Sequence, residues 1–247
     1  MKKNGKINNN NWSIDNMTLE VKVCGITRSN DIEKIQKLDV DHIGFINIER
    51  SKRNVTLDEI CSLKYDLIDK TMAVLVVEPE NPYEAIMKTS FTKIGNIQLH
   101  SLNCSDLKFI SWFNQYYSPN GLNITKVVPI TGKLTDAKIH EIVNTSLCAN
   151  NILFDYEKDG LSGGTNTQIP IDTAVKASKL VKQNYPTTKT TLAGGINLEY
   201  LEEIYDKLHY FDRIDINSGV EDAPGCKNIG EIKKAKIKIP KPKYILP

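Results

Sequence analysis

The fold is decided by the stretch LEVKVCGIT at residues 19–27 and by the segment that follows it. Its β-branched and apolar residues predict a short, largely buried strand over residues 19–24. A helical pattern follows over residues 30–37, where Asn30 ahead of Asp31 is expected to cap the first turn. A strand and a helix therefore form one unit, and the rest of the chain repeats this unit.

Further strands are expected at residues 42–47, 71–77, 95–100, 124–129, 151–155, 190–193 and 213–216. Helices are expected between them at residues 57–68, 82–89, 105–116, 135–145, 171–184, 198–208 and 228–235. Such alternation predicts a parallel sheet, because each helix carries the chain back to the same sheet edge. Eight units close a (β/α)8 barrel, so we predict an α/β fold with a single, parallel, eight-stranded TIM barrel. An open doubly wound sheet is the alternative, but no G-x-G-x-x-G follows the first strand.

Two polar extensions flank the expected domain. Residues 1–17 are rich in Asn and are expected to be a disordered extension, with Met17 a candidate start of the chain. Residues 18–238 form the expected barrel domain. Residues 239–247 carry three prolines and are expected to be an exposed tail that cannot continue a helix.

Composition narrows the class of partner. Of the 247 residues, 32 are Lys or Arg and 30 are Asp or Glu, which gives no electrostatic reason to expect a nucleic acid or membrane partner. The apolar runs are too short for the ~20 residues of a membrane helix. The five cysteines are odd in number and lack C-x-x-C spacing, so neither a disulfide scaffold nor a metal site is expected. We predict a reduced, cytoplasmic enzyme that is a monomer or a homodimer.

Reactive groups of such barrels lie at the carboxyl ends of the strands, and two stand out here. Cys24 ends the first strand and shares a strand face with Lys22, whose charge is expected to lower the pKa of the thiol toward neutrality. Asp155 ends the sixth strand, where burial would raise the pKa of its carboxyl so that it can donate a proton. The alternatives are a buried core cysteine and a turn-forming aspartate.

Other strand ends offer groups that bind anions. Glycine-containing loops follow the last two strands, at Gly194-Gly195 and Ser218-Gly219, and allow backbone N–H groups to approach a phosphate. Arg53 lies in a basic segment after the second strand and could hold a carboxylate, although a solvated loop is the alternative. His100 ends the fourth strand and is expected to be polar support at the rim.

Six short motifs in collinear order between residues 21 and 237 resemble those of the phosphoribosylanthranilate isomerases of tryptophan biosynthesis. They are KVCGIT at residues 22–27, GF with SKR at 44–45 and 51–53, QLH at 98–100, Asp155 with GGT at 163–165, LAGGIN at 192–197, and DINSGVE with PG at 215–221 and 224–225. Asn217 replaces a serine of the family motif, and the glycine-rich segment at 163–168 lacks the family's fourth glycine and its lysine.

The resemblance implies an Amadori rearrangement of N-(5'-phosphoribosyl)anthranilate to 1-(2-carboxyphenylamino)-1-deoxyribulose 5-phosphate, with no metal or organic cofactor. By position, Cys24 matches the general base and Asp155 the general acid. The resemblance also implies contacts to this phosphorylated small molecule, and these substrate-binding residues are Arg53, Gln98, His100, Gly194, Gly195, Asn217, Ser218 and Gly219.

Two other functions remain open. One is a related sugar-phosphate isomerase, either the ring-opening enzyme of histidine biosynthesis or an enzyme that acts on both substrates. The histidine enzyme usually has Asp where this chain has Cys24. The other is a non-catalytic barrel that binds a phosphorylated regulator, which the altered segment at residues 163–168 favours.

Overall fold

The structure is a computed structural model that describes residues 19–117, 121–158, 161–162 and 168–239. The predicted extension at residues 1–17 lies outside the described residues. So do residues 240–247 of the predicted tail and the GGT segment at residues 163–165.

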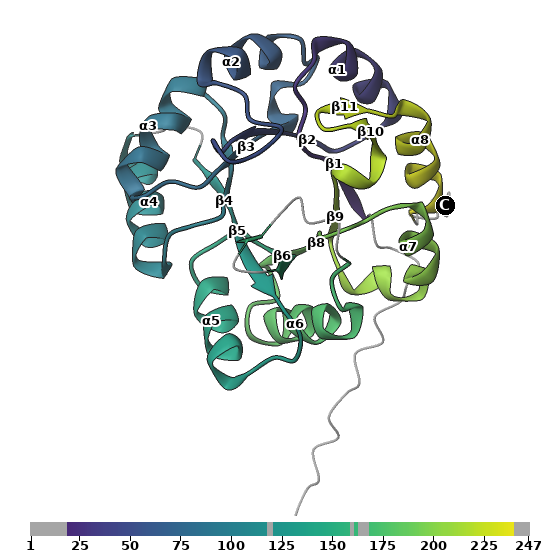
Figure 1. Cartoon of the computed structure of the whole chain (residues 1–247). Helices are drawn as coiled ribbons and strands as arrows, with labels where there is room; N and C mark the ends of the chain where they lie inside the picture. Colours follow the sequence, from purple (N-terminus) through teal and green to yellow (C-terminus); the bar gives the residue numbers. More distant parts are fainter. Residues whose placement is uncertain (1–18, 118–120, 159–160, 163–167, 240–247) are drawn as a thin grey trace, which may run out of the picture.

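The strands close into a barrel of parallel strands (Figure 1). The barrel strands are β1 (Glu20–Val23), β2 (His42–Asn47), β3 (Ala73–Val77), β4 (Asn96–Leu99), β5 (Asn123–Ile130), β6 (Asn151–Lys158), β8 (Lys189–Leu192) and β9 (Arg213–Ile216). Each pairs in parallel with its neighbours along the sheet, β9 returns to β1, and the pairing of β5 with β6 closes the ring. The predicted (β/α)8 barrel is confirmed.

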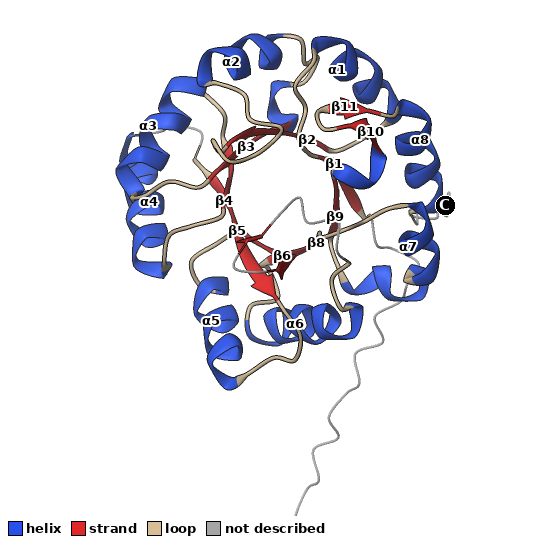
Figure 2. Cartoon of the chain, in the orientation of Figure 1, coloured by secondary structure: helices blue, strands red, loops and turns tan. Residues whose placement is uncertain are grey.

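A ring of helices covers the outside of the barrel (Figure 2). The α-helices are α1 (Ser29–Ile35), α2 (Leu57–Tyr65), α3 (Pro82–Thr92), α4 (Cys104–Tyr117), α5 (Asp136–Ser146), α6 (Ile171–Asn184), α7 (Leu198–Glu203) and α8 (Ile229–Lys238). Apolar side chains from the outer faces of the strands and the inner faces of these helices form the main core. None of the described helices is long and apolar enough to cross a membrane.

The helix starts follow local capping chemistry. Thr135 caps α5 through its side chain, and Thr56 forms a capping box with Glu59 on α2. The prediction that Asn30 caps the first helix is wrong. That helix begins one residue earlier, at Ser29, and Arg28 occupies the cap position without a side-chain hydrogen bond.

Polar side chains occupy two levels of the barrel interior. At the amino-terminal level, Glu20 accepts hydrogen bonds from Arg213 at 2.9 and 2.6 Å, contacts Lys189, and lies 3.5 Å from His42. Above it, Lys22 pairs with Asp215. Because one face of a strand repeats every second residue, both levels follow from the alternation along β1 and β9.

Two features outside the barrel differ from expectation. A hairpin of β10 (Glu221–Ala223) and β11 (Cys226–Lys227) follows β9, where the sequence indicates only a loop.

The prediction of reduced cysteines is wrong for one pair. Cys104 and Cys148 form a disulfide whose Cα atoms are 5.8 Å apart. Their separation of 44 residues gives no local sign of this pairing.

Candidate active site

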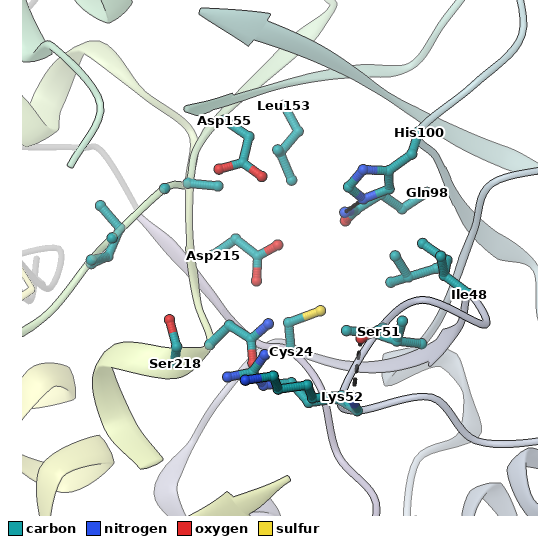
Figure 3. A pocket seen from close by; sticks show the side chains of 18 of the residues that line it. Cys24, Ile48, Ser51, Lys52, Gln98, His100, Leu153, Asp155, Asp215 and Ser218 are labelled. Carbon is teal, nitrogen blue, oxygen red and sulfur yellow. Dashed lines mark hydrogen bonds between the residues drawn. The ribbon is translucent and has the colours of Figure 1, made fainter. Parts of the chain in front are cut away.

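A cavity of about 460 Å³ lies at the carboxyl end of the barrel strands. Among the described residues, its wall contains every sequence-predicted site residue except Gly219, as the following list shows: Cys24, Arg53, Gln98, His100, Asp155, Gly194, Gly195, Asn217 and Ser218. Side chains from opposite sides of the barrel converge on this space in Figure 3. The strand ends therefore meet as the barrel geometry predicts.

Gly219 lies behind the cavity wall and has a packing role. A Cβ atom at this position would lie 2.0 Å from the carbonyl oxygen of Ile196. The loop after β9 therefore packs directly against the loop after β8, and any side chain at position 219 would separate them. The two glycine-containing loops form one continuous surface.

The Asp155 carboxyl has the properties expected of an acid. Burial raises its pKa to about 7, and the negative charge of Asp215 acts in the same direction. The backbone N–H of Tyr156 donates to Oδ1 of Asp155 at 2.8 Å and partly opposes this rise. At neutral pH this carboxyl can therefore hold a proton and release it.

The Cys24 thiol differs from expectation. Burial raises its pKa, and the Lys22 ammonium opposes this rise without reversing it. The reason is that Lys22 is already paired: its Nζ donates to Oδ2 of Asp215 at 2.6 Å and to Oε1 of Gln98 at 2.8 Å. The prediction that Lys22 brings the pKa of the thiol toward neutrality is wrong, because burial raises this pKa by more than Lys22 lowers it, and the Asp215 carboxylate adds to the rise.

Asp215 was missed by the sequence reasoning as a functional residue. It lies between Asp155 and Cys24 in the cavity (Figure 3). Its side chain is 93% buried, and its Oδ1 atom has no hydrogen-bond partner among the described residues. Alternation along β9 could have revealed it, since Asp215 and Arg213 must face the barrel interior together.

His100 and Gln98 form the opposite wall. Gln98 spans two groups, because its Oε1 accepts from Lys22 and its Nε2 lies 3.2 Å from Nε2 of His100. Burial lowers the pKa of His100 to about 3, so its imidazole is neutral. This agrees with the prediction of polar support.

The basic segment after β2 divides into three different environments. Arg53 is 92% buried and donates from Nε and Nη2 to the Glu221 carboxylate at 2.5–2.9 Å. Arg50 is paired with Glu78 at 2.8 and 2.9 Å, and Lys52 is exposed. Glu221 and its second partner, Lys227, were also missed, because nothing local indicates that a hairpin brings them under the cavity.

The described residues contain no group of three or more His, Cys, Asp or Glu side chains placed to hold a metal ion. The absence of a metal or cofactor stays a prediction. The chemistry of the cavity is that of an acid, a thiol, a neutral imidazole and two regions suited to anions.

The comparisons with known proteins point to one family. Residues 21–236 match the family described as N-(5'phosphoribosyl)anthranilate (PRA) isomerase. The N-(5'-phosphoribosyl)anthranilate isomerase of Methanothermobacter thermautotrophicus is 33% identical over 213 residues, 84% of this chain and 83% of that protein. The homologue from Clostridium beijerinckii is 30% identical over 213 residues, 82% of this chain and 87% of that protein.

Solved structures share the fold. The phosphoribosyl anthranilate isomerase of Thermotoga maritima has a TM-score of 0.72 at 21% identity and covers 88% of this chain and 97% of its own. A phosphoribosyl anthranilate isomerase in complex with reduced 1-(o-carboxyphenylamino)-1-deoxyribulose 5-phosphate has a TM-score of 0.70 at 20% identity, over 90% of this chain and 98% of its own.

Proposed function

The chain belongs to the N-(5'-phosphoribosyl)anthranilate isomerase family and catalyses that family's isomerisation in tryptophan biosynthesis, and we propose that Cys24 is its general base and Asp155 its general acid. The observation that carries this assignment is that both groups line one cavity, with Asp215 between them. An acid and a base on two sides of a sugar are what an aldose–ketose rearrangement requires.

The reaction begins at the ribose ring. Asp155 gives its proton to the ring oxygen, the bond from C1' to that oxygen breaks, and the anthranilate nitrogen forms a double bond to C1'. Cys24 as thiolate then removes the proton on C2', and the electron pair forms the enolamine. Addition of a proton at C1' and loss of the proton on the C2' hydroxyl give the ketone.

The reactive protonation state needs a thiolate together with a carboxylic acid. The pKa of Cys24 is raised by burial, and that of Asp155 is about 7, so a thiol beside a carboxylate is the more populated state. The two states contain the same number of protons. The reactive one therefore forms by transfer of one proton from Cys24 to Asp155, without a change in net charge.

We infer that the unpartnered Oδ1 of Asp215 accepts a hydrogen bond from a ribose hydroxyl of the substrate. A hydroxyl is the fitting ligand because it donates a hydrogen bond, which a buried carboxylate oxygen needs. Since Asp215 acts on the pKa of both Cys24 and Asp155, its carboxylate is near both reacting groups. The C2' hydroxyl, on the carbon from which Cys24 removes a proton, is the natural donor.

The ends of the substrate occupy the two anion-binding regions. Gly194, Gly195 and Ser218 surround the phosphate, and both glycines have positive φ values, of 87° and 64°, that favour glycine. Arg53 binds the carboxylate of the anthranilate ring. Holding both ends positions the ribose between acid and base.

The test is the fluorescence of the anthranilate substrate, followed as the purified chain consumes it. Turnover of this substrate, and none of the ring-opening substrate of histidine biosynthesis, is the expected result. Tight binding of the reduced product analogue with no turnover would instead identify a regulator. The cytoplasmic location and the monomeric or homodimeric state stay predictions, and a Thermotoga maritima homologue is described as dimeric.

A further inference from the structure

Lys227 is a fully buried lysine that the reaction scheme does not use. It lies on β11, and 0% of its side chain is exposed. Its Nζ donates to Oε1 of Glu221 at 2.6 Å, to Oδ1 of Asn217 at 2.9 Å and to the Asn217 carbonyl oxygen at 3.2 Å. Lys227 does not line the cavity, so it cannot touch the substrate. Burying an ammonium group is costly, and these three acceptors offset the cost.

Lys227 determines the charge around Arg53. Glu221 is the cross-strand partner of Lys227 in the hairpin and also accepts the bidentate hydrogen bonds of Arg53. Arg53 and Glu221 alone would be a neutral pair with little attraction for an anion. With Lys227 the cluster of Arg53, Glu221 and Lys227 holds two positive charges and one negative charge, all largely buried. The net charge of the cluster is therefore positive.

Lys227 also holds the loop that follows β9. It donates one hydrogen bond to the backbone of Asn217 and one to its side chain, and both this side chain and that of Arg53 lie close to Gly25. A Cβ atom at Gly25 would lie 2.6 Å from Oδ1 of Asn217 and 2.7 Å from Cδ of Arg53. The Lys227 ammonium thus contacts Asn217 directly and Arg53 through Glu221.

We propose that Lys227 is a positioning residue that keeps the Arg53 region positively charged toward the carboxylate of the substrate. Lys227 offsets the negative charge of Glu221, and Arg53 makes the contact with the substrate carboxylate. This inference rests on the proposed function and on the role assigned there to Arg53. It predicts that the charge of Lys227 matters for binding the carboxylate and matters little for the acid–base steps.

The experiment compares Lys227→Met with the double variant Glu221→Gln/Lys227→Met. The single variant leaves Arg53 neutralised, so KM for the anthranilate substrate should rise about tenfold while kcat stays within about threefold. The double variant removes one charge of each sign, so Arg53 again carries an uncompensated charge and KM should return to within about threefold of wild type. Lys234→Met, at an exposed position of α8 and paired with Glu231, is the matched control and should change neither constant.

A substrate analogue with aniline in place of anthranilate distinguishes an effect at the carboxylate end of the substrate from one at the phosphate end. It lacks the carboxylate, so Lys227→Met should not raise its KM. The proposal is overturned if the analogue suffers the same loss, or if the double variant is as impaired as the single one. Lys227→Gln, which keeps a hydrogen-bond donor, replaces Lys227→Met if that variant fails to fold. An inactive wild type would overturn the proposed function itself, whereas an active wild type with unchanged KM in the variant overturns only this inference.

Discussion

The Nζ atom of Lys22 lies 2.6 Å from Oδ2 of Asp215, and both side chains are more than 90% buried inside the barrel. Each charge is compensated mainly by the other, and Lys22 also donates to the Gln98 amide oxygen. Replacing Lys22 with Met leaves a buried carboxylate without its cation. We expect the free energy of unfolding at pH 7 to fall by about 3–5 kcal/mol, measured by urea denaturation.

The double variant Lys22→Met/Asp215→Asn should recover most of this stability, because no uncompensated charge remains. It should not recover activity if Asp215 binds the ribose hydroxyl. A loss below about 1 kcal/mol in Lys22→Met would contradict the view that the pair is mutually dependent.

Cys24→Ala and Asp155→Ala should each lower kcat at least ~100-fold, in line with the contribution of a general acid or base. Binding of the reduced product analogue, measured by calorimetry, should persist in both variants, because the contacts to the two ends of the ligand are unchanged. Cys61→Ala on α2, outside the cavity, is the matched control and should retain full turnover. Near wild-type kcat in either catalytic variant would refute the assignment.

The Asp155 carboxyl should lower the free energy of unfolding at neutral pH. Burial raises the pKa of its carboxyl from 3.8 to about 7, so the folded state binds a proton more tightly than the unfolded state does. Stability from this group is complete below pH 3.8 and is lost as the pH rises through about 7. Asp155→Asn should therefore raise the free energy of unfolding at pH 8, by on the order of 2–4 kcal/mol, and not at pH 3.5.

Denaturant unfolding at the two pH values measures this difference. Asp206→Asn, at an exposed position of the 3-10 helix Tyr205–Tyr210, is the control and should show no such dependence. Equal effects of Asp155→Asn at both pH values would mean that the carboxyl has an ordinary pKa. A stabilised but inactive variant would be typical of an active-site residue held in an unfavourable environment.

The amino-terminal end of the barrel should show the opposite pH dependence. Burial alone would raise the pKa of Glu20, but hydrogen bonds from His42, Lys189 and Arg213 lower it well below its ordinary value of 4.5. A lowered carboxyl pKa gives stability that is present above pH 4.5 and is lost as the pH falls. Glu20→Gln should therefore cost about 1–3 kcal/mol at pH 7 and progressively less below pH 4.5.

Turnover of Glu20→Gln should stay close to wild type at temperatures where it is folded, because the carboxyl end of the barrel is unchanged. Glu33→Gln, which removes an exposed partner of Lys37, should have no measurable effect on unfolding. A pH-independent loss in Glu20→Gln would indicate that packing, and not charge, is the contribution of Glu20.

The fold could be predicted from the sequence because the hydrophobic periods of strands and helices differ and the strand-helix unit occurs eight times. The ranges of β2 and β9 agree with prediction at both ends, as does α6. The same alternation predicts that Cys24 and Asp155 meet, since all strands end at one rim. Local patterns contain this information.

Interactions between distant segments were not predictable in the same way. The pairing of Lys22 with Asp215 joins residues 193 positions apart, and that of Arg53 with Glu221 joins residues 168 positions apart. The pKa of Cys24 is raised first by burial and further by Asp215, so its direction could not be read from Lys22 alone. The disulfide of Cys104 and Cys148 likewise depends on how α4 and the end of α5 pack.

The position of the Cys24 thiol in the cavity depends on a glycine, Gly44, on the neighbouring strand. A Cβ atom on Gly44 of β2 would lie 2.7 Å from the sulfur of Cys24 and 3.0 Å from Cε of Lys22. Gly44→Ala must therefore displace the thiol, and kcat should fall at least ~10-fold, because a shift of ~1 Å in a reacting group is costly. KM should change less, since the atoms nearest to this methyl group belong to Cys24 and Lys22 and not to the residues that hold the phosphate and the carboxylate.

Gly95→Ala is the matched control for this substitution. Gly95 immediately precedes β4, and among the described residues its new Cβ atom would meet only the Gly121 carbonyl oxygen, at 3.9 Å. Turnover should be unchanged there. If both alanine variants lose activity equally, the loss reflects general destabilisation of the sheet. If only Gly44→Ala loses activity while its melting temperature stays near that of wild type, the position of the sulfur is the cause, because the two changes add the same methyl group to the same barrel.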